Sequence, residues 1–121
     1  MERSDRSYWD AWRLRERQAA ATAAAWRKAR LAEAQSAADA LVEQLGARRV
    51  VLFGSLASER AKPGSDVDIW VDGLPPEQYL EAIALARAHI HQAEVDLVPS
   101  EWASPSLRAR VEAEGVLLGG A

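Results

Sequence analysis

VVLFGSLASERAKPGSDVDIWV, residues 50–71, is the segment from which the architecture of this chain can be inferred. The β-branched run at 49–53 ends at Gly54, as a buried strand followed by a turn does. Residues 66–72, DVDIWVD, alternate strictly and predict a second strand. Its core face carries Val67, Ile69 and Val71, and its other face carries Asp66, Asp68, Trp70 and Asp72.

A long helix is expected before this segment. Residues 7–45 are rich in Ala and contain no Gly or Pro, and Gly46 is a natural end. Its second half has a clear apolar stripe: Leu31, Ala34, Ala38, Leu41, Val42 and Leu45. A straight helix of this length would run roughly 58 Å. We therefore expect it to bend, at the alanine run 19–25, or to project from the domain.

Alternating helix and strand patterns follow the segment. A helix is predicted at 76–91 with Leu80, Ile83, Ala84 and Ile90 inward, and a strand at 94–98. Ser104 should cap a helix ending at Glu114, and 116–118 should form a fourth strand. The expected fold is α/β (α+β): a small mixed sheet with helices packed on one face. A helical extension (1–30) would precede the domain (31–121).

Composition narrows the functional classes. The 121 residues include no Cys, which excludes disulfides, thiolate zinc sites and a cysteine nucleophile. No apolar run is long enough to span a membrane, and the N-terminus lacks the apolar region of a secretion signal, so a cytoplasmic protein is expected. Residues 1–49 carry ten basic and seven acidic groups (+3), and residues 50–121 carry five and eleven (−6). Nucleic-acid binding by the acidic part is therefore not expected.

Three aspartates are the candidate chemical centre. Asp66 and Asp68 are two apart on a strand and point to the same face. Asp96 has the same parity on the strand at 94–98. Three such carboxylates repel unless a cation lies among them, and their hard oxygen atoms suit Mg²⁺ or Mn²⁺. A two-metal site of this kind serves phosphoryl or nucleotidyl transfer. Gly54 and Ser55, at a strand end, permit close backbone approach to a phosphate.

Gly54-Ser55, ten intervening residues and then Asp66-Val67-Asp68 resemble the motif of minimal nucleotidyltransferases (MNT) in the DNA polymerase beta superfamily. EVDLV, with Asp96, is similar to the third acidic strand of that family. The resemblance covers about residues 31–118. It implies transfer of a nucleoside monophosphate, most often AMP from ATP, to an acceptor hydroxyl. Many small members are prokaryotic antitoxins of HEPN–MNT pairs, which adenylylate a tyrosine of a helical HEPN partner.

The resemblance also implies roles for individual residues. Asp66 and Asp68 would be metal ligands, and Asp96 would be the third ligand and would activate the acceptor. Gly54 and Ser55 would bind the triphosphate. Lys62 and Ser65 are further candidate nucleotide contacts, although either can be an ordinary loop residue.

One departure from the family leaves alternatives open. Leu56 stands where many relatives carry Arg, and Arg60 or Lys62 would have to supply the positive charge. An antitoxin that acts by protein contact with a weak or inactive site is therefore a second hypothesis. An antibiotic-modifying nucleotidyltransferase is a third, although the chain leaves no room for a large acceptor domain.

The aromatic side chains of the first helix are not needed for catalysis. Trp9, Trp12 and Trp26 are expected to be buried against the core or another subunit, because exposed Trp is costly. A homodimer formed through this helix is therefore expected. Trp70 would either stack on a base or pack against a helix.

Overall fold

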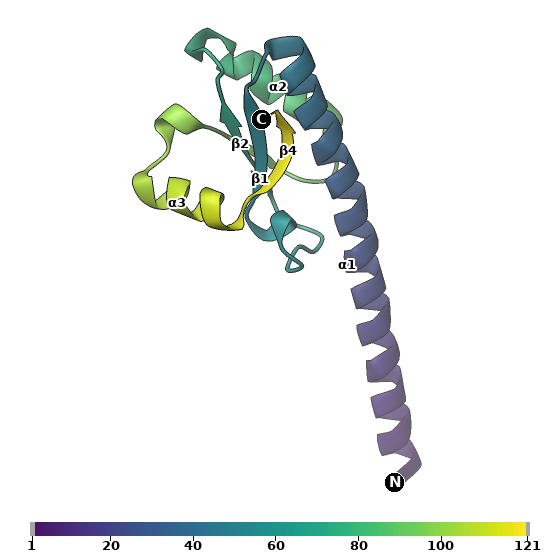
Figure 1. The fold of residues 1–121 in the computed structure, drawn as a ribbon. Helices are drawn as coiled ribbons and strands as arrows, with labels where there is room; N and C mark the ends of the chain where they lie inside the picture. The colour runs from purple at the N-terminus through teal and green to yellow at the C-terminus, as the bar shows by residue number, and fades with distance from the viewer. Residues whose placement is uncertain (1, 121) are drawn as a thin grey trace.

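A four-stranded mixed sheet forms the centre of the computed structural model, which describes residues 2–120, with side chains from Arg6 onward (Figure 1). The strands are β1 (Arg49–Phe53), β2 (Val67–Asp72), β3 (Val95–Pro99) and β4 (Val116–Gly120), in the order β3-β2-β1-β4. β1 pairs antiparallel with β2 and β4, whereas β2 and β3 are parallel. The predicted mixed sheet is confirmed, and β4 is two residues longer than expected.

Two helices cover one face of the sheet, and a third helix covers part of the other. α1 (Glu2–Leu45) and α2 (Tyr79–His89) enclose the main core with the inward residues of the strands, including Val50, Leu52 and Ile69. α3 (Pro105–Glu114) packs through Val111 on the opposite face. The hydroxyl of Ser104 accepts a hydrogen bond of 3.2 Å from the Leu107 amide, which confirms the predicted cap.

α1 is one uninterrupted helix, so the predicted bend at 19–25 is wrong and the projecting alternative holds (Figure 1). Its 44 residues correspond to about 66 Å, and it begins at Glu2 rather than at residue 7. Alanine is the best helix former, and nothing packs on residues 6–22 to bend the helix. Within residues 2–120, neither this helix nor any other has an apolar stretch that could cross a bilayer.

The second half of α1 packs as its stripe predicts. Ala34, Ala38 and Leu41 are completely buried. Burial begins before the predicted boundary at 30/31, because Trp26 and Arg30 are both nearly inaccessible and the guanidinium lies 5.5 Å from the indole. The division into 1–30 and 31–121 stays a prediction, and α1 passes through it without a break.

The buried face of α2 agrees with the expected one at Ile83 and Ile90, which pack in the core, and differs from it at Leu80 and Ala84. Leu80 is 83% exposed and Ala84 is exposed, whereas Tyr79, Ala82 and Ala86 are buried. The ring of Tyr79 packs edge-on against Trp102, with 4.8 Å between the ring centres. With Tyr79 on the inner side of α2, the next residue, Leu80, points to solvent. The apolar periodicity alone fits either face, so it did not distinguish them.

A polar network links the sheet to α3, and it is buried at Asp72 and Trp70 and exposed at Glu112. Asp72 accepts hydrogen bonds from Arg49 Nε (2.6 Å) and Trp70 Nε1 (3.1 Å), and Arg49 also contacts Glu112 of α3 at 2.8 Å. Burial opposes the ionisation of Asp72, but its hydrogen bonds, with that from Arg49 foremost, hold its pKa below the usual range. Trp70 is fully buried, with Arg108 5.1 Å above its ring, so it packs against a helix and is not available to a base.

Candidate active site

The site is built where β1 ends and β2 begins. Gly54 follows β1 directly and has φ +75° and ψ −156°, a conformation that only glycine adopts readily. A Cβ added here would overlap with the carboxylate of Asp68. Glycine therefore suits this position for two reasons: the turn needs a positive φ, and the carboxylate of Asp68 lies where a Cβ would be.

The sheet register brings Asp68 and Asp96 together. Asp68 is paired with Phe53 of β1 on one side and with Asp96 of β3 on the other. Adjacent strands lie about 4.8 Å apart, and directly paired residues point to the same face, so the two carboxylates are neighbours. Asp66 immediately precedes β2 and is exposed, as is Asp96, whereas Asp68 is half-buried.

The electrostatics of Asp68 reflect this crowding. Burial, then the charge of Asp96 and then that of Asp66 raise its pKa to about 6. Arg110 of α3 acts in the opposite direction. The carboxylates therefore form one mutually repelling group on the sheet face predicted from their parity.

The donor set fits a hard divalent cation, because all three side chains offer carboxylate oxygen atoms. As the side chains stand, no three acidic or histidine residues within the described part of the chain converge closely enough to hold an ion. The backbone places Asp68 and Asp96 side by side, whereas coordination would need rotation of exposed side chains. The metal site thus stays a prediction.

The candidate nucleotide contacts Ser55, Lys62 and Ser65 lie in the loop between β1 and β2. Ser55 opens a short 3₁₀ helix (Ser55–Ala57), whose first amides lack partners within that helix. Ser65 is a turn residue: its hydroxyl accepts from the Lys62 amide (3.1 Å) and its own amide donates to the Lys62 carbonyl (2.9 Å). Lys62 is exposed, and Arg60 Nε lies 3.2 Å from the hydroxyl of Ser58.

Two features of the site were missed by sequence reasoning. Leu56 is completely buried, so the position that departs from the relatives' Arg serves the core. Arg110 is the cation that acts on Asp68, and it reaches the site because α3 packs on this face of the sheet. A packing position for α3 could not be read from its own sequence, which has only one buried residue, Val111.

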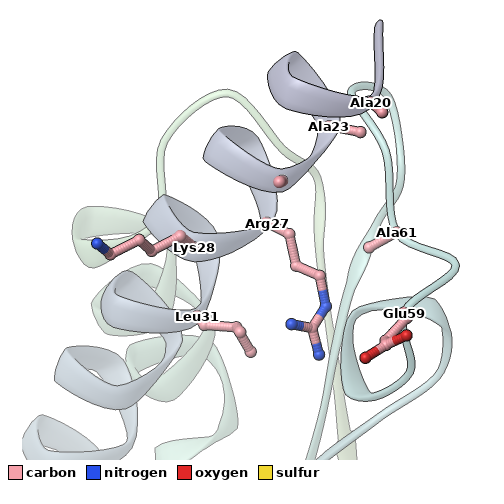
Figure 2. A pocket seen from close by; sticks show the side chains of 8 residues that line it. Ala20, Ala23, Arg27, Lys28, Leu31, Glu59 and Ala61 are labelled. Atoms are coloured by element: carbon pink, nitrogen blue, oxygen red, sulfur yellow. The ribbon is translucent and has the colours of Figure 1, made fainter. Parts of the chain in front are cut away.

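A hollow of the molecule lies away from the aspartates. A cavity of about 540 Å³ lies between α1 and the loop at Glu59 and Ala61, and none of the three aspartates lines it (Figure 2). Asp66 and Asp96 are exposed on a sheet face that α3 covers only in part.

Comparisons with known proteins agree with this geometry. Residues 35–120 match the family model described as "Polymerase beta, Nucleotidyltransferase". The chain is similar to a toxin–antitoxin structure with AMP-PNP (28% identity, 72% of this chain and 73% of that one, TM-score 0.60). It is also similar to a chain of the MntA–HepT toxin–antitoxin (26%, 75% and 73%, 0.55).

A third similar structure holds a tri-AMPylated HEPN toxin of Shewanella oneidensis with its MNT antitoxin (27% identity, 72% of each chain, TM-score 0.50). A comparison with curated protein sequences gives no significant match.

Replacing the crowded carboxylate should stabilise the metal-free protein. Since the pKa of Asp68 is raised in the folded state, its ionisation costs stability as the pH rises from about 4 to about 6. We expect Asp68→Asn to unfold at a higher temperature than wild type at pH 7.5 without divalent metal, and the difference to vanish below pH 4. Asp10→Asn, an exposed position on α1, is the control and should change nothing. A lower melting temperature for Asp68→Asn at pH 7.5 would contradict the crowding.

Gly54→Ala tests the contact between the turn and Asp68. Both this variant and Gly64→Ala place a side chain at positive φ, but open space surrounds only Gly64. Gly54→Ala should lose more stability in denaturant unfolding, by about 1–3 kcal/mol, because it also displaces Asp68. Equal losses for the two variants would show that backbone conformation alone matters.

Proposed function

We propose that this chain, which belongs to the polymerase beta nucleotidyltransferase family, transfers AMP from ATP to a hydroxyl group of a protein partner. The observation that carries this proposal is the position of Asp68, held between Gly54 and the directly paired Asp96. A phosphate-approachable turn and a carboxylate pair on one sheet face are the two components that metal-dependent nucleotidyl transfer requires.

The proposed division of roles extends the motif resemblance to the observed strands. Asp66 and Asp68, with Asp96, would hold Mg²⁺ (or Mn²⁺), whose charge would neutralise the triphosphate and the carboxylates together. Gly54 and Ser55 lie against the triphosphate, with Ser65 and Lys62 in the adjoining loop. The acceptor oxygen attacks the α-phosphorus, its proton passes to Asp96, and the bond to the bridging oxygen breaks to release pyrophosphate.

We further propose that the acceptor is a HEPN-type protein and that the chain is the antitoxin of such a pair. The similar structures are complexes of MNT antitoxins with HEPN toxins, one of them AMPylated and another with AMP-PNP. The exposure of Asp66 and Asp96 is consistent with a protein acceptor, because both side chains are accessible to a large partner. A tyrosine hydroxyl is the proposed acceptor group. ATP and such a partner would be met in the cytoplasm.

The positive charge near the triphosphate is assigned to Arg110. Leu56 is in the core and Arg60 is hydrogen-bonded to Ser58, whereas Arg110 is exposed and its charge lowers the pKa of Asp68. A guanidinium here would bind a phosphate oxygen once the cation occupies the carboxylates.

The buried Leu56 also supports the second candidate function, an antitoxin that neutralises its partner by contact without transfer. The two functions share the fold and the partner. They differ in whether neutralisation needs the carboxylates, which the following experiment measures.

The test is transfer to a helical HEPN-type protein supplied as the partner. Wild type with ATP and Mg²⁺ should add the mass of AMP groups to that partner, as detected by intact-mass spectrometry, and chelation of Mg²⁺ should abolish it. Asp66→Asn/Asp68→Asn should lose transfer by at least roughly 10³-fold. Glu81→Gln, which removes an exposed carboxylate on α2, is the control and should transfer normally. A double variant that transfers as well as wild type would refute the proposal, and one that neutralises without transfer would favour contact.

Arg110→Ala tests the source of positive charge. We expect ATP to bind roughly tenfold more weakly, about 1.4 kcal/mol, in isothermal titration with Mg²⁺ present. Arg87→Ala, exposed on α2, should bind ATP as wild type does. Unchanged affinity in Arg110→Ala together with weaker binding in Lys62→Ala would move the assignment to the loop.

A further inference from the structure

The two halves of α1 differ in their surroundings. The free half carries an aromatic cluster, Tyr8, Trp9 and Trp12, which are 59%, 53% and 43% exposed and whose successive ring centres lie 5.5 and 6.0 Å apart. The predicted burial is confirmed for Trp26 but is wrong within this chain for Trp9 and Trp12, and the homodimer through this helix stays a prediction. The half from Trp26 onward packs on the domain.

Three segments of the candidate active site meet at one edge of the sheet. β1 is antiparallel to β2, and β2 is parallel to β3, so the end of β1 lies beside the beginnings of β2 and β3. This edge carries Gly54 and Ser55 after β1, Asp66 just before β2, and the segment 90–94 that leads to β3. α1 passes beside this edge, and the loop that follows β1 reaches the helix there (Figure 1).

On one side, α1 is fixed to the segment that leads to β3. Arg30 is buried, its guanidinium lies 5.5 Å from the centre of the Trp26 ring, and its Nε is 2.8 Å from the carboxylate of Glu33. The same carboxylate accepts a hydrogen bond of 3.0 Å from the His91 amide, and Arg30 donates to the side chain of Gln92 at 3.4 Å. Residues 26–33 of the helix are therefore held in a defined position against the edge.

On the other side, Arg27 joins α1 to the loop after β1. Its Nε donates a hydrogen bond of 3.1 Å to the carbonyl oxygen of Ser58, and Figure 2 shows the side chain reaching from the helix toward this loop. The cavity of about 540 Å³ lies between the helix and the same loop, and the helix residues around it include Ala20, Ala23 and Ala24. The long side chain of Arg27 thus spans a gap that small side chains leave open.

Ser58 closes the turn on which the triphosphate is proposed to lie. Its amide and its hydroxyl both donate to the carbonyl of Ser55, at 3.2 and 3.0 Å. The 3₁₀ helix that opens at Ser55 therefore ends at the residue to which Arg27 is bonded. Leu56 anchors the same turn to the core through its side chain, whereas Arg27 holds the backbone. A shift of Ser58 would be passed to Ser55 through two hydrogen bonds.

We infer that Arg27 is a positioning residue, which holds Ser58 and thereby fixes the orientation of the turn at Gly54 and Ser55 toward the triphosphate. This role rests on the proposed function, because it presupposes that the turn binds a nucleotide. Arg27 acts through the turn and not on the nucleotide, because its Nε is bonded to Ser58 and none of the three aspartates lines the groove that it enters. Supporting contacts of this kind keep binding groups in a productive geometry.

Two substitutions separate the hydrogen bond of Arg27 from its charge. In Arg27→Gln the amide nitrogen lies as many bonds from the backbone as Nε does, so a donor is kept and the charge is lost, whereas Arg27→Met loses both. In isothermal titration with Mg²⁺ present, Arg27→Met should bind ATP roughly fivefold more weakly, as for the loss of one hydrogen bond, and Arg27→Gln should bind it as wild type does. Lys28→Met removes an exposed charge beside the same groove and should also bind normally. Gln and Met are good helix formers, so α1 should persist, which circular dichroism checks.

Hydrogen exchange of the nucleotide-free protein measures the turn directly. Amides in residues 55–60 should exchange at least roughly threefold faster in Arg27→Met than in wild type, because the turn opens more often without its bond to α1. Arg27→Gln should restore the wild-type exchange rate. A loss of stability elsewhere in the domain would not produce this pairing of results.

The outcomes separate the role of Arg27 from the proposed function. Wild type that binds no ATP would refute the proposed function and this role with it, whereas wild-type binding that Arg27→Met leaves unchanged would refute the role of Arg27 alone. Equal losses of ATP affinity in Arg27→Met and Arg27→Gln would assign the effect to charge and overturn positioning through Ser58. Exchange in residues 55–60 that Arg27→Met does not alter would overturn it as well.

Discussion

The pairing of β2 with strands on both sides is the constraint on which the rest of the site depends. Backbone hydrogen bonds fix Asp68 opposite Phe53 and Asp96, so the carboxylates cannot separate without loss of the sheet. Gly54 then follows Phe53 at the point where Asp68 needs space. The burial of Asp68, and after it the charge of the paired Asp96, raise the pKa of Asp68, and both follow from its place in the core strands.

The strands and their faces were predictable because β structure has a period of two. Val67, Ile69 and Val71 could only share a face, which fixed Asp66 and Asp68 on the other, and spacing then indicated the turn at Gly54. The buried face of α2 was harder to predict from the sequence. Leu80 and Tyr79 fit a buried stripe equally well in sequence, and tertiary packing against Trp102 selected Tyr79. Neither Arg110 near Asp68 nor Trp70 beneath Arg108 could be inferred, because both follow from where α3 docks.

The loop after Gly54 shows how one position can serve the core at the expense of the site. Leu56 fills space beneath the 3₁₀ turn, so a charge at that position would have to be buried. Leu56 supplies no charge, so the cations near the site are Arg60 and Lys62 of the loop and Arg110 of α3. Arg49 links α3 to the sheet, because it contacts both Asp72 of β2 and Glu112 of α3. The polar network at one end of β2 therefore supports the arrangement at the other end.

The continuity of α1 has a consequence for how the chain can vary. Because no hinge separates the projecting half from the packed half, every residue inserted between Trp12 and Trp26 rotates the aromatic cluster by about 100° relative to the sheet. Length changes of seven or eleven residues would nearly restore the angular phase, whereas a change of two or five would turn the cluster to the far side. The length of the helix therefore sets both the direction in which Trp9 and Trp12 point and their distance from the sheet. Only length changes close to a whole number of helical turns would keep that direction.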